Sequence, residues 1–114
     1  MKRIEAFIQD VKLSSVVDAL KAVGVGGLTV TKSQGRGAGE RPQLRAGRGT
    51  GTITAEYSLT DSIITVVEDS KLEPTVSAIM NAASTGNKGD GKVFVTTIND
   101  AYDIANKQKI SGRI

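Results

Sequence analysis

A glycine-rich segment divides this 114-residue chain into two halves. Each half can form a packed structure, whereas the segment between them cannot. Residues 24–51 contain nine of the thirteen glycines, with Pro42 among them. From Gln34 to about Gly51 neither a helical nor a strand period is present, so this stretch lacks the apolar surface that would offset the entropy lost on ordering. Long structureless loops inside compact domains are uncommon and are usually functional or disordered. We therefore predict a mobile arm between two ordered halves.

The first half has the pattern strand, helix, strand. Apolar and polar residues alternate over 2–9, which predicts a strand with one apolar face. An apolar stripe at helical spacing over 16–23 predicts a helix. Residues 28–32 alternate again and include two β-branched threonines, which predicts a second strand.

The second half repeats this order without a detectable sequence repeat. The continuous apolar run 63–67 predicts a strand buried on both faces. A stripe over 72–83, Met80 included, predicts an amphipathic helix, and 93–98 predicts a last strand. From Asn99 the chain is polar, and we expect a short helix and a loose tail there.

The expected helices carry recognisable start and stop signals. Ser14 or Ser15 is expected to cap the first helix, and Ser70 with Glu73 three residues later forms a capping box for the second. Gly24 is expected to end the first helix. With these boundaries, two strand-helix-strand halves predict an α+β, ferredoxin-like βαββαβ sandwich. A four-stranded antiparallel sheet then carries both helices on one face, in a single domain over 1–114.

Composition excludes several classes of site. The chain has no cysteine and no histidine, so disulfides, thiolate nucleophiles, Cys/His zinc sites and Ser-His-Asp relays are absent. No pair of carboxylates is placed in a predicted cleft, and we expect no enzyme activity, no catalytic residues and no metal site. No apolar run of about 18 residues and no signal-peptide core are present, so we expect a cytoplasmic protein.

Positive charge is concentrated in the arm. Residues 32–48 hold five basic residues and one acidic residue, whereas the rest of the chain holds ten basic and eleven acidic residues. Because arginine-rich segments can fold on RNA, one hypothesis is an RNA- or acidic-surface-binding module that acts through Arg41, Arg45 and Arg48. No aromatic residue lies among these arginines to stack on bases, and DNA binding is not expected.

The loop before the last strand has features of a phosphate-binding sequence. Residues 86–92, GNKGDGK, nearly match the P-loop pattern, but Val93 stands where a Ser or Thr should hold magnesium. This loop also follows a helix and opens a strand, the reverse of a P-loop, and a P-loop hydrolase is therefore excluded. Glycine amides with Lys92 can still form an anion-binding nest, and the alternative is a solvated turn.

The same loop is similar to part of a known protein family. Residues 85–95, TGNKGDGKVFV, resemble the B-loop and last strand of the PII signal-transduction proteins. Residues 24–31 with Gly35 and Gly37 resemble the second strand of that family and the root of its T-loop. On this resemblance the T-loop spans about 35–57, the B-loop 85–92 and the C-terminal tail about 99–114.

The resemblance implies a homotrimer that binds an adenine nucleotide, ATP or ADP, in clefts between subunits. It implies that the T-loop controls an ammonium transporter or a nitrogen-metabolism enzyme, with Arg41, Arg45 and Arg48 presented to that partner. Gly89 to Lys92 would hold phosphates and Thr29 would contact adenine. The complete set of implied nucleotide-binding residues is Phe7, Thr29, Gly35, Gly37, Val66, Gly89, Asp90, Gly91 and Lys92.

The chain departs from the pattern of this family at several positions. Asp103 and Ala105 replace two arginines that follow the last strand, which implies weaker ATP binding or a preference for ADP or AMP. Gly39 replaces a glutamine that helps to bind magnesium and 2-oxoglutarate, which argues against 2-oxoglutarate and leaves magnesium with ATP open. Ile64 stands where an acidic residue is common. Ile53 aligns near a tyrosine that some relatives have uridylylated, so this modification is not expected.

Overall fold

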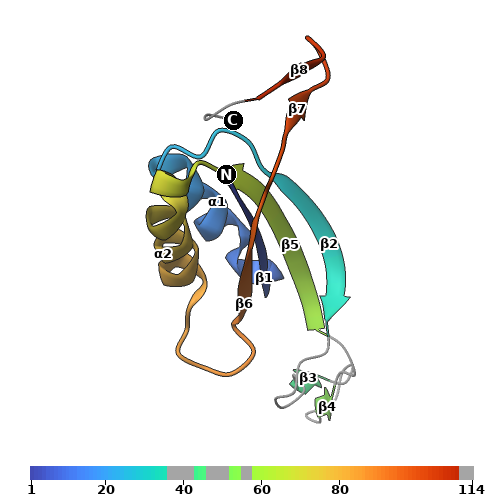
Figure 1. The fold of residues 1–114 in the computed structure, drawn as a ribbon. Coiled ribbons are helices and arrows are strands. Elements are labelled where there is room, and N and C mark those ends of the chain that lie inside the picture. The colour runs from blue at the N-terminus through green and yellow to red at the C-terminus, as the bar shows by residue number, and fades with distance from the viewer. Residues whose placement is uncertain (36–42, 46–51, 55–57, 111–114) are drawn as a thin grey trace.

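Four strands form one antiparallel sheet in the computed structural model, which describes residues 1–35, 43–45, 52–54 and 58–110. The order across the sheet is β2-β5-β1-β6, so β1 and β5 are central and β2 and β6 are edges (Figure 1). This order confirms the predicted ferredoxin-like α+β sandwich. The strands are β1 Lys2–Gln9, β2 Thr29–Gly35, β5 Ser58–Val67 and β6 Gly91–Thr97.

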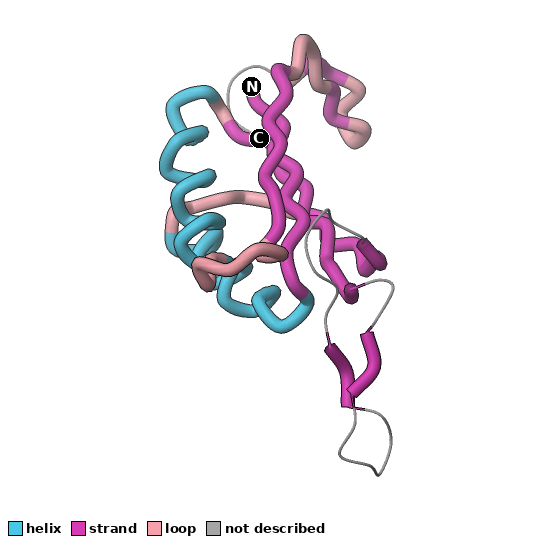
Figure 2. The backbone as a smooth tube through the Cα atoms, turned by 90° about the horizontal axis from the view of Figure 1, so that it is seen from below, coloured by secondary structure: helices cyan, strands magenta, loops and turns pink. Residues whose placement is uncertain are grey.

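Both helices cover one face of this sheet (Figures 1 and 2). They are α1 Leu13–Ala22 and α2 Leu72–Ala83, and each follows a short 3-10 turn, η1 Asp10–Lys12 and η2 Asp69–Lys71. Two small antiparallel ladders complete the described structure. The first pairs β3 Gln43–Arg45 with β4 Thr52–Thr54, and the second pairs β7 Tyr102–Asp103 with β8 Gln108–Lys109.

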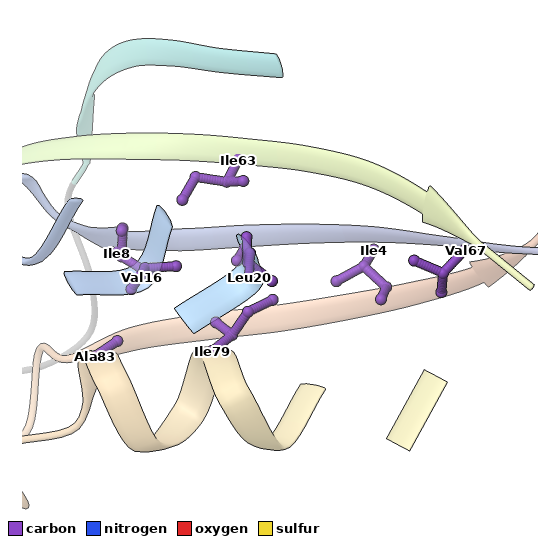
Figure 3. Packing of buried hydrophobic residues seen from close by; sticks show 9 residues of the cluster. Ile4, Ile8, Val16, Leu20, Ile63, Val67, Ile79 and Ala83 are labelled. Carbon is purple, nitrogen blue, oxygen red and sulfur yellow. The ribbon is translucent and has the colours of Figure 1, made fainter. Parts of the chain in front are cut away.

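The core lies between the helices and the sheet face that they cover, which we call the helix face. In β1 the predicted apolar residues Ile4, Ala6 and Ile8 are buried there. Figure 3 shows side chains of α1 and α2 packed against those of β1 and β5. The buried apolar cluster consists of Ile4, Ala6, Ile8, Val16, Leu20, Ile63, Val67, Ile79 and Ala83.

The opposite sheet face, which we call the open face, has no helix over it (Figure 1). Phe7 lies on it, opposite Ser62 on β5 and Lys92 on β6. One position away along the sheet, Phe94 packs edge-on against Phe7, with ring centroids 6.0 Å apart at 78°. Phe94 is still 51% exposed, so an aromatic surface is present on this face.

The first helix ends at Gly24, as the sequence predicts. Gly24 has a φ of 81°, its N–H donates to the Lys21 carbonyl, and the Val25 N–H donates to the Leu20 carbonyl. This pair of hydrogen bonds is a Schellman motif, which requires a left-handed residue at the Gly24 position. The glycine therefore ends the helix and turns the chain toward β2.

The predicted serine caps are wrong for both helices. Lys12 and Lys71 occupy the N-cap positions, and neither makes a side-chain capping hydrogen bond. The 3-10 turns η1 and η2 bring the chain into helical conformation before the serine signals can act, so Ser14 and Ser15 lie inside α1 and Ser70 lies inside η2.

The third long strand differs from its prediction. β5 is ten residues long, and helices cover only one of its faces (Figure 1). Ile63, Thr65 and Val67 are buried on the helix face, whereas Ile64 and Val66 on the open face are only half-buried. The apolar run is therefore continuous because both faces of β5 carry apolar residues, although helices cover only one.

The predicted helix after Asn99 is also wrong, because this segment forms the β7–β8 hairpin. The Asp103 carboxylate accepts the N–H of Ala105 at 2.8 Å, and the Asn106 amide oxygen accepts the N–H of Gln108 at 2.9 Å. Side chains that hydrogen-bond two residues along the backbone favour turns over helices.

Among the described residues, no helix is long and apolar enough to cross a membrane.

Gly91 allows β6 to begin against β1. It lies opposite Ile8 and has a φ of 121°. A Cβ built on Gly91 would lie 1.8 Å from the carbonyl oxygen of Phe7, which leaves no room for any side chain. The approach of the two backbones at this position fixes where the preceding loop meets the sheet.

Substituting Gly91→Ala tests this close approach. We expect a loss of at least about 3 kcal/mol in the free energy of unfolding, because the new Cβ meets backbone and the φ is strained. Gly27→Ala is the control, since its Cβ would meet nothing within 4 Å, and it should change stability by less than about 1 kcal/mol. Equal unfolding midpoints in urea for the two variants would contradict the requirement for glycine.

Candidate functional site

The B-loop, residues 85–92, is closed on itself by the side chain of Asp90. One carboxylate oxygen of Asp90 accepts the N–H groups of Thr85 at 2.7 Å and Gly86 at 3.1 Å. The other accepts the Thr85 hydroxyl at 2.6 Å. The Asp90 carboxylate therefore points into the loop and joins its two ends.

These hydrogen bonds lower the pKa of the Asp90 carboxyl below its usual value of 3.8. The Thr85 hydroxyl makes the largest contribution, followed by the Thr85 backbone N–H, because both stabilise the ionised form. The carboxylate is consequently charged, and the loop stays closed, throughout the neutral pH range.

A second contact attaches the B-loop to the sheet. The Gln9 side-chain amide donates to the Gly89 carbonyl at 3.0 Å, from the last residue of β1. Gly91 then starts β6, and Lys92 follows on the open face opposite Phe7. The loop is thus held at three points: Asp90 inside it, Gln9 beside it and Gly91 at its end.

A groove of about 350 Å³ lies beside this loop, between α2 and β6. This volume is at the lower end of the range of about 300–1,000 Å³ for small-molecule pockets. The walls are mostly apolar, and Ser84, Asp90 and Lys92 supply the polar groups. Its lining consists of Phe7, Ile8, Val76, Ile79, Met80, Ala83, Ser84, Asp90, Gly91, Lys92, Val93 and Val95.

Positive charge lies beside the apolar groove, because Lys92 lies at the start of β6, where the B-loop ends, although its side chain lies on the open face of the sheet and not between α2 and β6. Lys92 is exposed, and Lys88 lies in the same loop. Among the residues that the structure describes, no carboxylate forms an ion pair with either lysine. Two ammonium groups and the glycine-rich backbone can therefore attract an anion, while the apolar wall can accept a flat or aliphatic group.

The structure brings together part of the predicted nucleotide site. Phe7, Asp90, Gly91 and Lys92 line the groove, and Gly89 lies beside it in the same loop. Thr29 and Val66 lie elsewhere on the open face, Thr29 on the edge strand β2 opposite Ile64, and Val66 on β5.

Two edges of the sheet therefore carry different parts of the predicted site. Lys92 is on edge strand β6 and Thr29 is on edge strand β2, and three strand spacings separate these edges, about 14 Å. Gly35 is the last residue of β2, opposite Ser58, where the chain enters the T-loop. A single copy of the chain does not bring these residues to the groove.

Several predicted positions fall in the T-loop. Gly37, Arg41 and Arg48 lie outside the described residues. Arg45 is the last residue of β3, whose backbone pairs with β4.

In the described part of the chain, no three carboxylates gather into a group that could hold a metal ion.

Two residues of the site are not identified by sequence patterns. Gln9 ends an alternating strand, and no local pattern indicates that its amide holds the B-loop. Met80 is predicted as part of the apolar core stripe, but it is 51% exposed and lines the groove. Its position near the edge of the α2 stripe is the only sequence signal for this exposure.

Comparison with known proteins identifies close similarity over almost the whole chain. Residues 1–108 match the family model described as Nitrogen regulatory protein P-II. A protein of that name from Azospirillum brasilense is 38% identical over 109 residues, which is 96% of each chain. Proteins of the same name from Bradyrhizobium diazoefficiens and Pyropia yezoensis are 39% and 38% identical, and the matches cover 91% and 86% of each chain.

The Asp90 contacts predict a pH-dependent B-loop. A carboxyl whose pKa is lowered by folding stabilises the folded loop above the unfolded value of 3.8, and this contribution is lost as the pH falls through the lower, folded pKa. We therefore expect the backbone amide NMR signals of Thr85 and Gly86 to titrate together, with a midpoint below 3.8. Asp90→Ala should shift both signals at pH 7, whereas Asn87→Ala should leave the Asp90 titration in place. A midpoint at or above 3.8 would contradict the closed loop.

Proposed function

Because this chain belongs to the P-II family of nitrogen regulatory proteins, we propose that it binds an adenine nucleotide beside its B-loop and thereby controls a partner protein. Proteins of this family are regulatory signal transducers and not enzymes, and the chain is accordingly a signal-transduction regulator of nitrogen metabolism. Binding of an adenine nucleotide and control of a partner protein are our proposals for this chain.

The closed B-loop beside an apolar groove is the observation that carries the nucleotide proposal. Phosphate groups need fixed N–H donors and a cation, which the glycines of the loop and Lys92 supply. A base or ribose needs an apolar surface, which the groove wall supplies. Asp90 acts indirectly in this proposal, since its carboxylate accepts hydrogen bonds from Thr85 and Gly86 and thereby keeps the loop closed.

We propose that the site is completed by a second copy of the chain in a homotrimer. The implied adenine contacts, Thr29 and Val66, lie toward the β2 edge, and the implied phosphate contacts lie at the β6 edge. If the β2 side of one subunit meets the β6 side of the next, both sets can contact the same nucleotide. The half-buried Ile64 and Val66 and the exposed Phe94, all on the open face, support the burial of this face in an assembly.

The T-loop is the proposed contact with the partner. Its arginines, Arg41, Arg45 and Arg48, give it the positive charge to bind an acidic surface on an ammonium transporter or a nitrogen-metabolism enzyme.

Asp103, in the β7–β8 hairpin, adds negative charge where typical members have arginine. We therefore propose that ADP or AMP binds in preference to ATP, since each removed phosphate lowers the repulsion, and that 2-oxoglutarate is not an effector.

The oligomeric proposal predicts that a charge on the open face dissociates the protein. Light scattering should give the mass of three chains for the wild type. Phe94→Glu should shift the population toward single chains, because a carboxylate would then be buried at the contact. Val11→Glu is the control, since Val11 is 81% exposed on η1. A Phe94→Glu protein that stays trimeric at micromolar concentration would argue against the open face as the contact.

The nucleotide proposal predicts calorimetric binding that depends on Lys92. ATP, ADP and AMP are each titrated into the protein, and we expect at least one of them to bind below millimolar concentration. Lys92→Ala should weaken that binding by about tenfold or more, since hydrogen bonds to charged groups contribute about 1.5–3 kcal/mol. Lys21→Ala, an exposed lysine on α1, should leave the affinity unchanged.

The same titrations distinguish the alternative of an RNA- or acidic-surface-binding module that acts through the T-loop alone. That module would bind polyanions with an affinity that falls steeply with salt and does not respond to ADP. Absence of binding of all three adenylates at millimolar concentration would exclude the nucleotide proposal and leave this alternative.

A further inference from the structure

A buried carboxylate lies at the start of β5, on the helix face. Asp61 is fully buried, and its neighbours across the sheet are Ile8 on β1 and Lys32 on β2. The positions that follow it on this face of β5 are Ile63, Thr65 and Val67, all without charge. Burial of an ionised group is costly unless the group is paired, so the partners of Asp61 decide whether this arrangement is stable.

The Lys32 ammonium group forms ion pairs with Asp61 and with a second carboxylate, Asp10. Lys32 Nζ lies 3.2 Å from Asp61 Oδ1 and donates to Asp61 Oδ2 at 3.3 Å. The same nitrogen donates to Asp10 Oδ1 at 2.5 Å. Among the described residues, Asp61 Oδ1 has no hydrogen-bond donor of its own. Lys32 is therefore the group that compensates both carboxylates, and we call these three residues the ion cluster.

The ion cluster joins three elements at the base of the T-loop. Lys32 is on β2, three residues before Gly35, where the chain enters the T-loop, and Asp61 is on β5, three residues after Ser58, where it returns. Asp10 begins η1. In Figure 1 the end of β2 and the start of β5 lie together, at the same end of the sheet as the loop before β6.

Asp10 also lies next to the residue that holds the B-loop. Its neighbour Gln9 donates to the Gly89 carbonyl, so adjacent residues contact the B-loop and Lys32. Two sets of polar contacts are thus joined by the Gln9–Asp10 peptide bond: Gln9 contacts Gly89, and Asp10 is bound to Lys32, which also contacts Asp61. A displacement of the B-loop can move Asp10, and through Lys32 it can move the strands that carry the T-loop.

We propose that Lys32 is a positioning residue which, held between Asp10 and Asp61, couples the occupancy of the B-loop to the T-loop. This proposal rests on the proposed nucleotide function and specifies how its signal is transmitted. The Lys32 side chain is 68% exposed, whereas Asp61 is fixed within a strand, so the ammonium can release Asp10 into water while Asp61 cannot move. The structure shows the cluster with Asp10 bound, and in this proposal a second arrangement, with Asp10 released into water, supplies the alternative state that coupling needs.

The charges of the cluster are consistent with a contact that persists at neutral pH. The hydrogen bond from Lys32 lowers the pKa of the Asp10 carboxyl, and the hydrogen bond to Asp10 raises the pKa of Lys32. Both groups are therefore charged at pH 7, and movement rather than titration would open the contact under these conditions.

The test compares ADP binding with hydrogen–deuterium exchange of peptides from residues 36–57. In the wild type we expect ADP to change the exchange rate of these peptides by at least about fivefold, a typical size of allosteric coupling. Lys32→Met keeps most of the aliphatic stem and removes the charge. We expect this variant to bind ADP with an affinity within about threefold of wild type but to lose most of the ADP-dependent change in exchange.

Three further variants make the result interpretable. Lys32→Arg keeps the charge and should keep the coupling, whereas a purely volumetric role would be disturbed by the larger group. Lys21→Met removes an exposed lysine from α1 and should change nothing. If Lys32→Met does not fold because Asp61 is left uncompensated, Asp10→Asn breaks only the exposed half of the cluster and should also lose the coupling.

The outcomes separate this proposal from the proposed function. ADP that binds and changes exchange equally in wild type, Lys32→Met and Asp10→Asn would overturn the role of Lys32. ADP that binds the wild type without changing exchange at 36–57 would overturn coupling altogether. Failure of ADP, ATP and AMP to bind the wild type would instead overturn the nucleotide function on which the proposal rests.

Discussion

Strand β1 is hydrogen-bonded on both sides, and its pleat sets the orientation of every side chain in the sheet. Ile4 lies opposite Thr65 on β5 and Val95 on β6, and all three point toward the helices. A slip of one residue along β6 would bring Lys92 and Thr96 beneath the helices and expose Val93 and Val95. The same register brings Lys92 and Phe7 to the open face, so the packing of the core also fixes the position of the candidate site.

Elements with a strong local period could be predicted from the sequence. The boundaries of β1 agree with the alternation over 2–9, and Gly24 ends α1 because a left-handed residue is needed there. Predictions that depended on a single short signal were less successful. The serine caps were displaced by 3-10 turns, and the polar residues after Asn99 formed a hairpin because Asp103 and Asn106 stabilise turns.

The candidate site could be predicted only where its groups are consecutive in the chain. The B-loop contains its three glycines and two lysines within eight residues, so the sequence indicates an anion site. The groove beside it is built from α2, β1 and β6, and no local pattern reports how these elements meet. The ion cluster is likewise invisible in the sequence, since Asp10, Lys32 and Asp61 are separated by more than twenty residues at each step and carry no motif.

The closure of the B-loop by Asp90 affects how quickly any anion is captured there. The three hydrogen bonds to the Asp90 carboxylate all form within the loop itself, so the conformational entropy of ordering the loop is lost on folding. An arriving anion meets a rigid receptor and needs no slow rearrangement before it binds, so association is governed by diffusion and charge. Competition between anions of similar shape is then decided by how fast each one leaves.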